Sequence, residues 1–162
     1  MQKKIIITGG LGYIGTELCK IYSGVSWNHK IIVIDNRFIS ERVNQIRNWN
    51  MEFVHGDILD KDLVERYCKD ANIVHHLAGI TDVPRVKSES NIKQDERINL
   101  VGEKGTQNIL DVISKSCKII FPSTHVVYEG MDKVKNDIQE NEETKPVLSY
   151  STSKAINEKQ LK

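Results

Sequence analysis

The sequence contains little cysteine and no long hydrophobic run. Three cysteines, Cys19, Cys68 and Cys117, lie far apart in 162 residues and form no Cys-x-x-Cys pair. This argues against a disulfide framework or a zinc site and fits a reducing cytoplasm. The apolar run at 5–7 is too short for an export signal. No stretch approaches the roughly 20 apolar residues of a membrane span, so we expect a cytoplasmic protein without a membrane partner.

Charge of one sign is also lacking. The 23 Lys and Arg residues nearly balance the 22 Asp and Glu residues, for a net charge of +1. Nucleic-acid-binding domains normally carry a clear positive excess, so the balance argues against a nucleic-acid partner and favours a small molecule. A chain of this length buries roughly 70% of its unfolded surface, enough for one core. We therefore expect a single domain over 1–162.

Short apolar runs alternate with helical patterns along the chain. The predicted strands are 4–7, 30–34, 52–54, 72–77 and 118–121. Helices are expected at 11–22, 41–49, 61–69 and 95–114, and from 149 onward. Continuously apolar strands that alternate with helices are typical of a parallel sheet covered on both faces. The sequence thus predicts an α/β, Rossmann-like doubly wound parallel sheet.

Three local features lie within this pattern. Asp60 precedes the helix expected at 61–69 and is placed to cap its first turn. Gly102 and Gly105 lie in the longest expected helix and would allow close approach of whatever packs there. A polar loop over 130–146 precedes the last helix.

A glycine-rich turn follows the first expected strand. Residues 8–15 read Thr-Gly-Gly-Leu-Gly-Tyr-Ile-Gly, which fits Gly10-x-Gly12-x-x-Gly15 or Gly9-x-x-Gly12-x-x-Gly15. In both patterns the absent side chains let backbone N–H groups approach a pyrophosphate at the positive end of the next helix. The segment therefore predicts a dinucleotide site.

A carboxylate supports this prediction. Asp35 ends the second expected strand, 20 residues after Gly15, where it can accept both hydroxyls of the adenosine ribose. Its charge would repel a 2′-phosphate, so NAD is the preferred cofactor, although the nearby Arg37 keeps NADP open. The alternative is that the glycines only form a turn and Asp35 is a surface carboxylate.

Tyr150 and Lys154 are spaced to lie on one face of the last helix. An ammonium beside a phenol lowers the phenol pKa from about 10 and gives a general base for a substrate hydroxyl. Thr124 follows the fifth strand at the sheet edge where open α/β folds bind ligands, and it could hydrogen-bond the reacting oxygen. The alternatives are a solvated lysine beside a partly buried tyrosine, and turn residues at Ser123 and Thr124.

These residues belong to an ordered series of motifs. The series is the turn at 8–15, Asp35-Asn36, Gly56-Asp57-Ile58, His76-Leu77-Ala78-Gly79, Asn99, Gly105-Thr106-Gln107-Asn108, Ser123-Thr124, Tyr128 and Tyr150-x-x-x-Lys154. Together they resemble the extended short-chain dehydrogenase/reductases, and more narrowly the NAD-dependent epimerase/dehydratase group that acts on nucleotide sugars. The resemblance runs along essentially the whole chain.

The resemblance implies a role for each motif. Tyr150, as phenolate, would take the proton from a sugar hydroxyl while hydride passes from that carbon to the nicotinamide. Lys154 would hold the nicotinamide ribose and lower the tyrosine pKa, and Thr124 would orient the hydroxyl. The implied cofactor-binding residues are Gly9, Gly12, Tyr13, Ile14, Gly15, Asp35, Asn36, Asp57, Ile58, Leu77, Ala78, Gly79, Thr81 and Asn99.

No metal site is expected. His75 and His76 are adjacent on a strand, so their side chains point to opposite faces, and we interpret both as structural. His125-Val126 stands where sugar 4,6-dehydratases of this family carry Asp-Glu. That departure argues against the dehydratase reaction and leaves an epimerase, a simple oxidoreductase or a 4-keto reductase. His125 is then an extra acid/base or, more simply, a loop residue.

Members of this group are usually longer than the present chain. We therefore expect the C-terminal strands and the substrate-binding region to be absent, with little turnover by this stretch alone. The rival hypothesis is a non-catalytic NAD(P)-binding fragment or an interaction module that lacks a substrate site. The resemblance also implies a homodimer, because the long fourth helix and the Tyr-Lys helix often pair across one.

Overall fold

The computed structural model describes residues 2–81, 88, 91–133 and 135–162. The chain forms two compact units. We call residues 1–79 and 105–122 the sheet unit, and residues 80–104 and 123–162 the helical unit.

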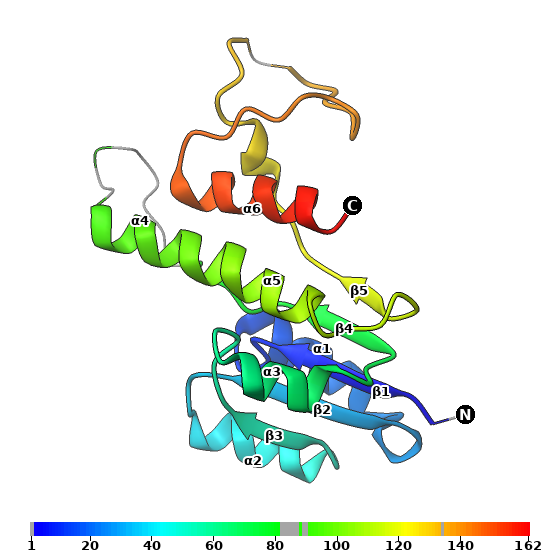
Figure 1. Ribbon diagram of the computed structural model, residues 1–162. Coiled ribbons are helices and arrows are strands. Elements are labelled where there is room, and N and C mark those ends of the chain that lie inside the picture. The colour runs from blue at the N-terminus through cyan, green and yellow to red at the C-terminus, as the bar shows by residue number, and fades with distance from the viewer. Residues whose placement is uncertain (1, 82–87, 89–90, 134) are drawn as a thin grey trace. The chain divides into compact units, whose positions relative to one another are not determined.

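Five parallel strands form the sheet, in the order β3-β2-β1-β4-β5 (Figure 1). Their bounds are β1 Lys4–Thr8, β2 Lys30–Asp35, β3 Glu52–His55, β4 Ile73–His76 and β5 Lys118–Ile120. All five predicted strands are present with ends shifted by a residue or two. The predicted Rossmann-like α/β fold is confirmed.

The sheet unit also contains four α-helices and one short 3-10 helix. These are α1 Tyr13–Ser23, η1 Ser26–Asn28, α2 Ser40–Asn48, α3 Lys61–Cys68 and α5 Gly105–Leu110. The Asp60 side chain accepts a hydrogen bond from the Leu63 N–H at 3.1 Å, so the predicted cap of α3 is confirmed. Removal of the Asp60 carboxylate would leave an N–H of the first helical turn without its hydrogen-bond partner.

The middle stretches of β1 and β2, residues 5–7 and 31–34, are apolar without interruption because both faces of the sheet are buried there. One face packs with α1 and α2, through Ile5, Ile7, Leu11, Cys19, Ile31, Val33, Val43, Ile46 and Met51. Ile6, Ile32 and Ile34 alternate with these residues and point to the opposite face, where they are also fully buried. Each such side chain stabilises the fold by roughly 1.5–3 kcal/mol.

The helical unit contains α4 Ile92–Asn99, the π-helical segment η3 Leu100–Lys104, the 3-10 helix η4 His125–Tyr128 and α6 Ser149–Gln160. The last helix begins at Ser149, as predicted. The helix predicted over 95–114 is present, but its ends are shifted and its middle is not α-helical. Helical structure begins at Ile92, is π-helical over 100–104 and ends at Leu110.

The interruption has a local cause in the packing of η3 against α6. The Asn157 side chain donates to the Gly102 carbonyl at 3.0 Å, and a Cβ on Gly102 would collide with Ser153 Oγ. A side chain that takes a helical carbonyl locally disturbs the regular hydrogen-bond ladder, and π-bulges form at such places. The close approach predicted at Gly102 is confirmed, and Gly105 makes its own with Ile58 in the sheet unit.

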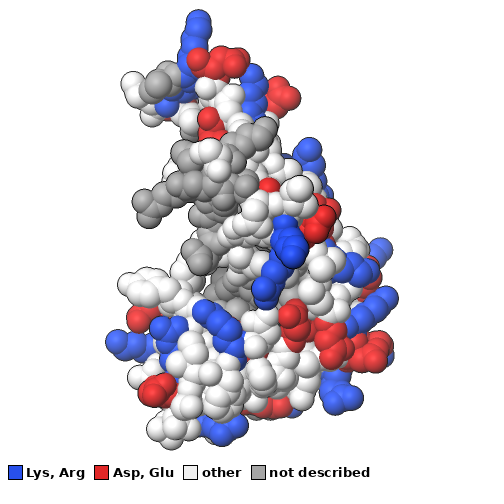
Figure 2. Space-filling view, turned by 90° about the vertical axis from the view of Figure 1, so that its left-hand side faces the viewer, with Lys and Arg blue, Asp and Glu red and all other residues white. Residues whose placement is uncertain are grey.

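The visible surface carries both signs of charge. Figure 2 shows Lys and Arg side chains interspersed with Asp and Glu side chains over the face that it presents. Within the described ranges, no helix has the length and apolar character needed to cross a membrane.

Candidate functional site

The glycine turn between β1 and α1 has the shape that the sequence predicts. Gly9 adopts φ +68°, and a Cβ on it would lie 2.6 Å from the Ala78 nitrogen. A Cβ on Gly15 would lie 2.5 Å from the Gly9 carbonyl oxygen. Both contacts are too short for any other residue. A Cβ on Gly10 would likewise collide with Val33, so the structure requires the glycines of both patterns at 9, 10 and 15.

The first turn of α1 is open to an anion. Gly12 is its N-cap and offers no side-chain cap, and the first turn contains no acidic residue. Tyr13 and Ile14 are 84% and 59% exposed. The first N–H groups of a helix have no partner within the helix, and the helix dipole adds positive potential there. The turn therefore fits the pyrophosphate of a dinucleotide.

The Asp35 carboxylate at the end of β2 forms hydrogen bonds with the backbone of the glycine turn. Its Oδ2 accepts from the Leu11 N–H at 2.8 Å, and its Oδ1 accepts from the Arg37 backbone N–H at 2.9 Å and from Arg37 Nε at 3.3 Å. Asp35 is buried, so these bonds are only weakly screened. The carboxylate retains lone pairs for ribose hydroxyls, but Arg37 competes for the same oxygen.

Arginines also lie against the glycine turn. The Arg37 guanidinium comes within 3.7 Å of the position that a Cβ on Gly12 would take. Arg42, from α2, donates to the Leu11 carbonyl. A 2′-phosphate would need a cation beside Asp35. Because Arg37 lies there, the geometry leaves NADP open as a cofactor, as the sequence does.

The residues that follow β2 and β3 are joined by a side-chain bond. Asn36 Nδ2 donates to Asp57 Oδ2 at 3.0 Å, and Asp57 Oδ1 accepts from the Leu59 N–H at 2.9 Å. Ile58 is only 4% exposed and packs beneath Gly105 of α5. Of the pair expected to flank the adenine, only Asp57 has a side chain that reaches the surface of the sheet unit.

The backbone after β4 forms the far wall of the glycine turn. Leu77 N–H donates to the Thr8 carbonyl at 3.1 Å, and Ala78 N–H donates to Thr8 Oγ1 at 3.2 Å. Gly79 is exposed, and no atom lies within 4 Å of the position of a Cβ there. The predicted cofactor residues from Gly9 to Gly79 therefore all fall in the sheet unit.

Two predicted cofactor residues and all three predicted catalytic residues belong to the helical unit. Thr81 is exposed and lies outside any helix or strand. Asn99 ends α4, and its Oδ1 is buried without a hydrogen-bond partner among the described residues. Thr124 is the N-cap of η4, and its Oγ1 accepts from the Val126 N–H at 3.3 Å. The Thr124 hydroxyl can still donate its hydrogen to a substrate oxygen.

Tyr150 and Lys154 lie on one face of α6, with Lys154 Nζ 5.9 Å from the centre of the Tyr150 ring. Burial lowers the pKa of Lys154 to about 8 and raises the pKa of Tyr150. The expected spacing is thus present, but the expected fall in the tyrosine pKa is not. Burial disfavours both charged forms, and the ammonium over the ring does not overcome that effect.

Glu129 fixes the start of α6 and was not identified from the sequence. Its Oε1 accepts from the N–H groups of Val147 and Leu148 at 2.9 and 2.8 Å and from the Ser151 hydroxyl. Burial alone would raise the pKa of Glu129, but these hydrogen bonds lower it. No local motif signals this role, because its partners lie 18 to 22 residues away.

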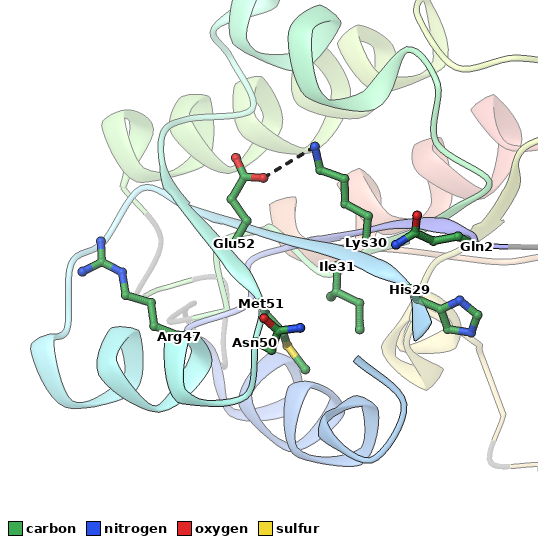
Figure 3. Close-up of a pocket in the computed structure, with 8 residues that line it drawn as sticks. All are labelled: Gln2, His29, Lys30, Ile31, Arg47, Asn50, Met51 and Glu52. Carbon is green, nitrogen blue, oxygen red and sulfur yellow. Dashed lines mark ion pairs between the residues drawn. The ribbon is translucent and has the colours of Figure 1, made fainter. Parts of the chain in front are cut away.

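A shallow hollow of about 470 Å³ lies at the opposite edge of the sheet (Figure 3). Lys30 and Glu52, which begin β2 and β3, form an ion pair of 3.8 Å in its wall. Parallel α/β sheets bind their ligands at the carboxyl ends of the strands, so this hollow is not the cofactor site. Over the described residues, no cluster of three or more His, Cys, Asp or Glu could hold a metal.

Known proteins resemble the chain over nearly its whole length. A profile of the 3-beta hydroxysteroid dehydrogenase/isomerase family matches residues 6–162. A dTDP-D-glucose 4,6-dehydratase from Dictyostelium discoideum is 32% identical over 94% of this chain and 38% of its own. A CDP-paratose 2-epimerase from Salmonella typhi is 35% identical over 82% of this chain and 40% of its own.

A solved structure gives the same result. The UDP-glucose 4-epimerase from Bifidobacterium longum, in complex with NAD+ and UDP, superposes with a TM-score of 0.77 at 29% identity. The superposition covers 98% of this chain and 48% of the epimerase. The chain therefore spans less than half the length of these relatives. The chain belongs to the extended short-chain dehydrogenase/reductases, in the family of NAD-dependent epimerases and dehydratases.

Proposed function

We propose that the chain binds NAD at the glycine turn and carries the Tyr-Lys pair of an oxidoreductase that acts on a nucleotide sugar. The observation that carries the proposal is the uncapped first turn of α1, which follows a turn so tight that Gly9 and Gly15 admit no side chain, and whose Leu11 N–H is held by Asp35. The NAD bound by the Bifidobacterium longum relative supports the choice of cofactor.

The residues of the helical unit would supply the proton chemistry. Tyr150 takes the proton from a sugar hydroxyl, and Thr124 donates a hydrogen bond that orients the hydroxyl. Lys154 would hold the nicotinamide ribose and stabilise the phenolate by its charge. When bound, NAD supplies the acceptor for the hydride. Because burial raises the Tyr150 pKa in the chain itself, efficient proton removal requires further positive charge near the phenol.

Epimerisation is the reaction that we favour within this class. The relatives include both epimerases and a dehydratase. Here the catalytic Thr124 is followed by His125 and Val126, where the dehydratases carry Asp-Glu. Elimination of water from a sugar needs an acid and a base at that place, which Val126 cannot provide. A simple oxidoreductase or a 4-keto reductase fits the same residues.

A non-catalytic module is the second candidate. The chain spans less than half the length of its relatives, and the sheet unit alone contains the complete glycine turn. A protein of this kind would bind NAD without oxidising any nucleotide sugar. We further propose a homodimer and a cytoplasmic location. The unpaired state of Cys19, Cys68 and Cys117 supports a reducing compartment.

A titration with NADH and NADPH, followed by cofactor fluorescence, tests the proposal. We expect saturable binding of both, with NADH the tighter ligand. Absence of binding, or tighter binding of NADPH, contradicts the assignment of NAD. Epimerisation returns the hydride to the sugar and leaves no net NADH. Incubation of the NAD-loaded protein with UDP-glucose or UDP-galactose, monitored for interconversion of the two sugars as well as for NADH, therefore separates the oxidoreductase from the non-catalytic module.

A further inference from the structure

A chain of buried polar groups runs behind the glycine turn, within the sheet unit. Thr8, His76 and Thr106 are at most 1% exposed, although the interior of a parallel sheet is normally apolar. Thr8 Oγ1 lies 3.0 Å from His76 Nδ1, and His76 Nε2 lies 2.9 Å from Thr106 Oγ1. The Ala78 N–H donates to Thr8 Oγ1. These hydrogen bonds thus connect α5 to the backbone that follows β4.

Strand register places these groups together. Thr8 pairs with His76 across β1 and β4, so both side chains lie on the same face of the sheet. His75 points to the other face, where its Nε2 lies 2.8 Å from the Tyr22 hydroxyl and burial lowers its pKa. The prediction that His75 and His76 face opposite ways is therefore confirmed, and each has a different partner helix.

Hydrogen-bond direction selects one neutral tautomer of His76. Thr8 Oγ1 accepts from Ala78, so its single hydrogen is available to His76 Nδ1. Nδ1 is then the unprotonated nitrogen, and Nε2–H donates to Thr106. The other tautomer would leave the buried Thr8 hydroxyl hydrogen without an acceptor among the described residues, which is costly.

This series of hydrogen bonds ends at Ala78, beside the glycine turn. The Ala78 nitrogen is the atom that a Cβ on Gly9 would meet at 2.6 Å. No side chain fits between Gly9 and the Ala78 peptide, so the position of that peptide bounds the space of the turn. The hydroxyl of Thr8 and the ring of His76 set the position of that peptide.

We propose that His76 is a positioning residue for cofactor binding. As the Nε2–H tautomer, it holds the Thr8 hydroxyl and the Ala78 peptide against Gly9 and thereby fixes the shape of the NAD cradle. The inference rests on the proposed function, because NAD is the ligand whose cradle is fixed. His76 is buried, so it would influence the cofactor through Thr8 and Ala78 and would not touch it.

The tautomer can be measured without any cofactor. A long-range ¹H–¹⁵N correlation spectrum at neutral pH, with His76→Gln to identify the signals, should show the neutral Nε2–H form. An Nδ1–H tautomer or an imidazolium at His76 would overturn the proposal. This readout is independent of NADH binding, so it separates failure of the positioning role from failure of the NAD assignment.

Binding then tests the consequence. Thr8→Val and Thr106→Val keep the shape but remove one hydroxyl each, and we expect the NADH dissociation constant to rise about fivefold to tenfold. Thr8→Ser keeps the hydroxyl and should restore nearly the original affinity. The control is Ile109→Val, which removes a buried methyl from the same helix as Thr106 and should change the constant by less than about twofold. Unchanged binding in both folded Val variants, or an equal rise in the control, contradicts the proposal.

Discussion

The two units of the molecule bury different kinds of side chain. The central strands β1 and β2 of the sheet unit bury a continuous run of isoleucine and valine at 5–7 and 31–34, whereas the buried positions of α6 are Ser151, Ser153, Ala155 and Asn157. Burial of apolar side chains stabilises a fold strongly and does not depend on the direction of each contact. Burial of polar side chains depends on a few hydrogen bonds that must all be made. The comparison indicates a rigid glycine turn on one unit and, on the other, a helix α6 held by specific polar contacts.

The largest expected effect separates the chemical roles of the units. In a form of the enzyme that turns over a nucleotide sugar, Tyr150→Phe should lower turnover about 10³-fold, because the general base is lost. NADH binding should change by less than about twofold, because the glycine turn is untouched. The control is Tyr67→Phe on α3, and retained turnover in Tyr150→Phe would mean that another group acts as the base.

A second substitution should destabilise the sheet unit. Gly9→Ala would force a Cβ against Ala78 at φ +68° and should cost about 3 kcal/mol of unfolding free energy, measured by urea denaturation. Gly24→Ala is the matched control, because Gly24 has φ −67° and its Cβ position is unobstructed. A Gly9→Ala variant as stable as Gly24→Ala would contradict the rigid turn.

A third substitution sharpens the view of the cofactor site. Asp35→Ala removes the carboxylate below the turn, and NADH binding should weaken about tenfold while the preference against NADPH relaxes. Asp70→Ala, at an exposed position of the same unit, should leave both affinities unchanged. Equal affinities for the wild type and Asp35→Ala would remove the ribose assignment.

A fourth substitution tests the polar anchoring of α6. Glu129→Ala removes the acceptor of three hydrogen bonds and should lower the local stability of α6 by about 1–2 kcal/mol. Amide hydrogen exchange should accelerate in α6 and stay unchanged in β1. Glu143→Ala, at an exposed position of the preceding loop, is the control, and uniform acceleration in both units would contradict the distinction between them.

The smallest effect is a pH dependence of stability. The pKa of Lys154 is about 8 in the folded chain, against an ordinary value of 10.5. Between these values Lys154 binds more protons in the unfolded chain than in the folded chain, so its contribution to the unfolding free energy should rise with pH. Burial raises the pKa of Cys19 and Cys68 from 9.0 to about 12, and these two groups oppose the rise above pH 9. The net rise is therefore expected between pH 8 and 9. The raised pKa of Tyr150 opposes this rise above pH 10.

Urea denaturation at several pH values between 8 and 9 measures this slope. Lys154→Met should flatten it, whereas the exposed Lys159 on the same helix serves as the control through Lys159→Met. An identical slope in Lys154→Met and the wild type would show that Lys154 is not the group that loses its proton in this range.

Much of the fold could be predicted because its signals are local. The apolar strands, the Asp60 cap and the start of α6 each depend on neighbouring residues. The glycine turn also follows from a short pattern, since sterics alone exclude a Cβ at Gly9 and Gly15. The roles of Tyr150, Lys154 and Thr124 were inferred from motif order, and their catalytic assignment stays a prediction.

The missed features depend on partners far apart in the chain. The helical periodicity over 95–114 continues through 100–104, but Asn157 takes the Gly102 carbonyl and the segment becomes π-helical. Glu129 has no motif, because its partners start at Val147. The direction of the Tyr150 pKa was also wrong, because spacing places the lysine but does not reveal how deeply both groups are buried.

The sequence by itself determined the order of strands and helices, the glycine turn and the family, because backbone sterics and hydrophobic periodicity act over a few residues. Tertiary structure alone decided which buried polar groups find partners: Asp35 with the Leu11 N–H, Glu129 with the start of α6, and His76 between Thr8 and Thr106. The reason is physical, since a hydrogen bond depends on distances that only the folded chain sets.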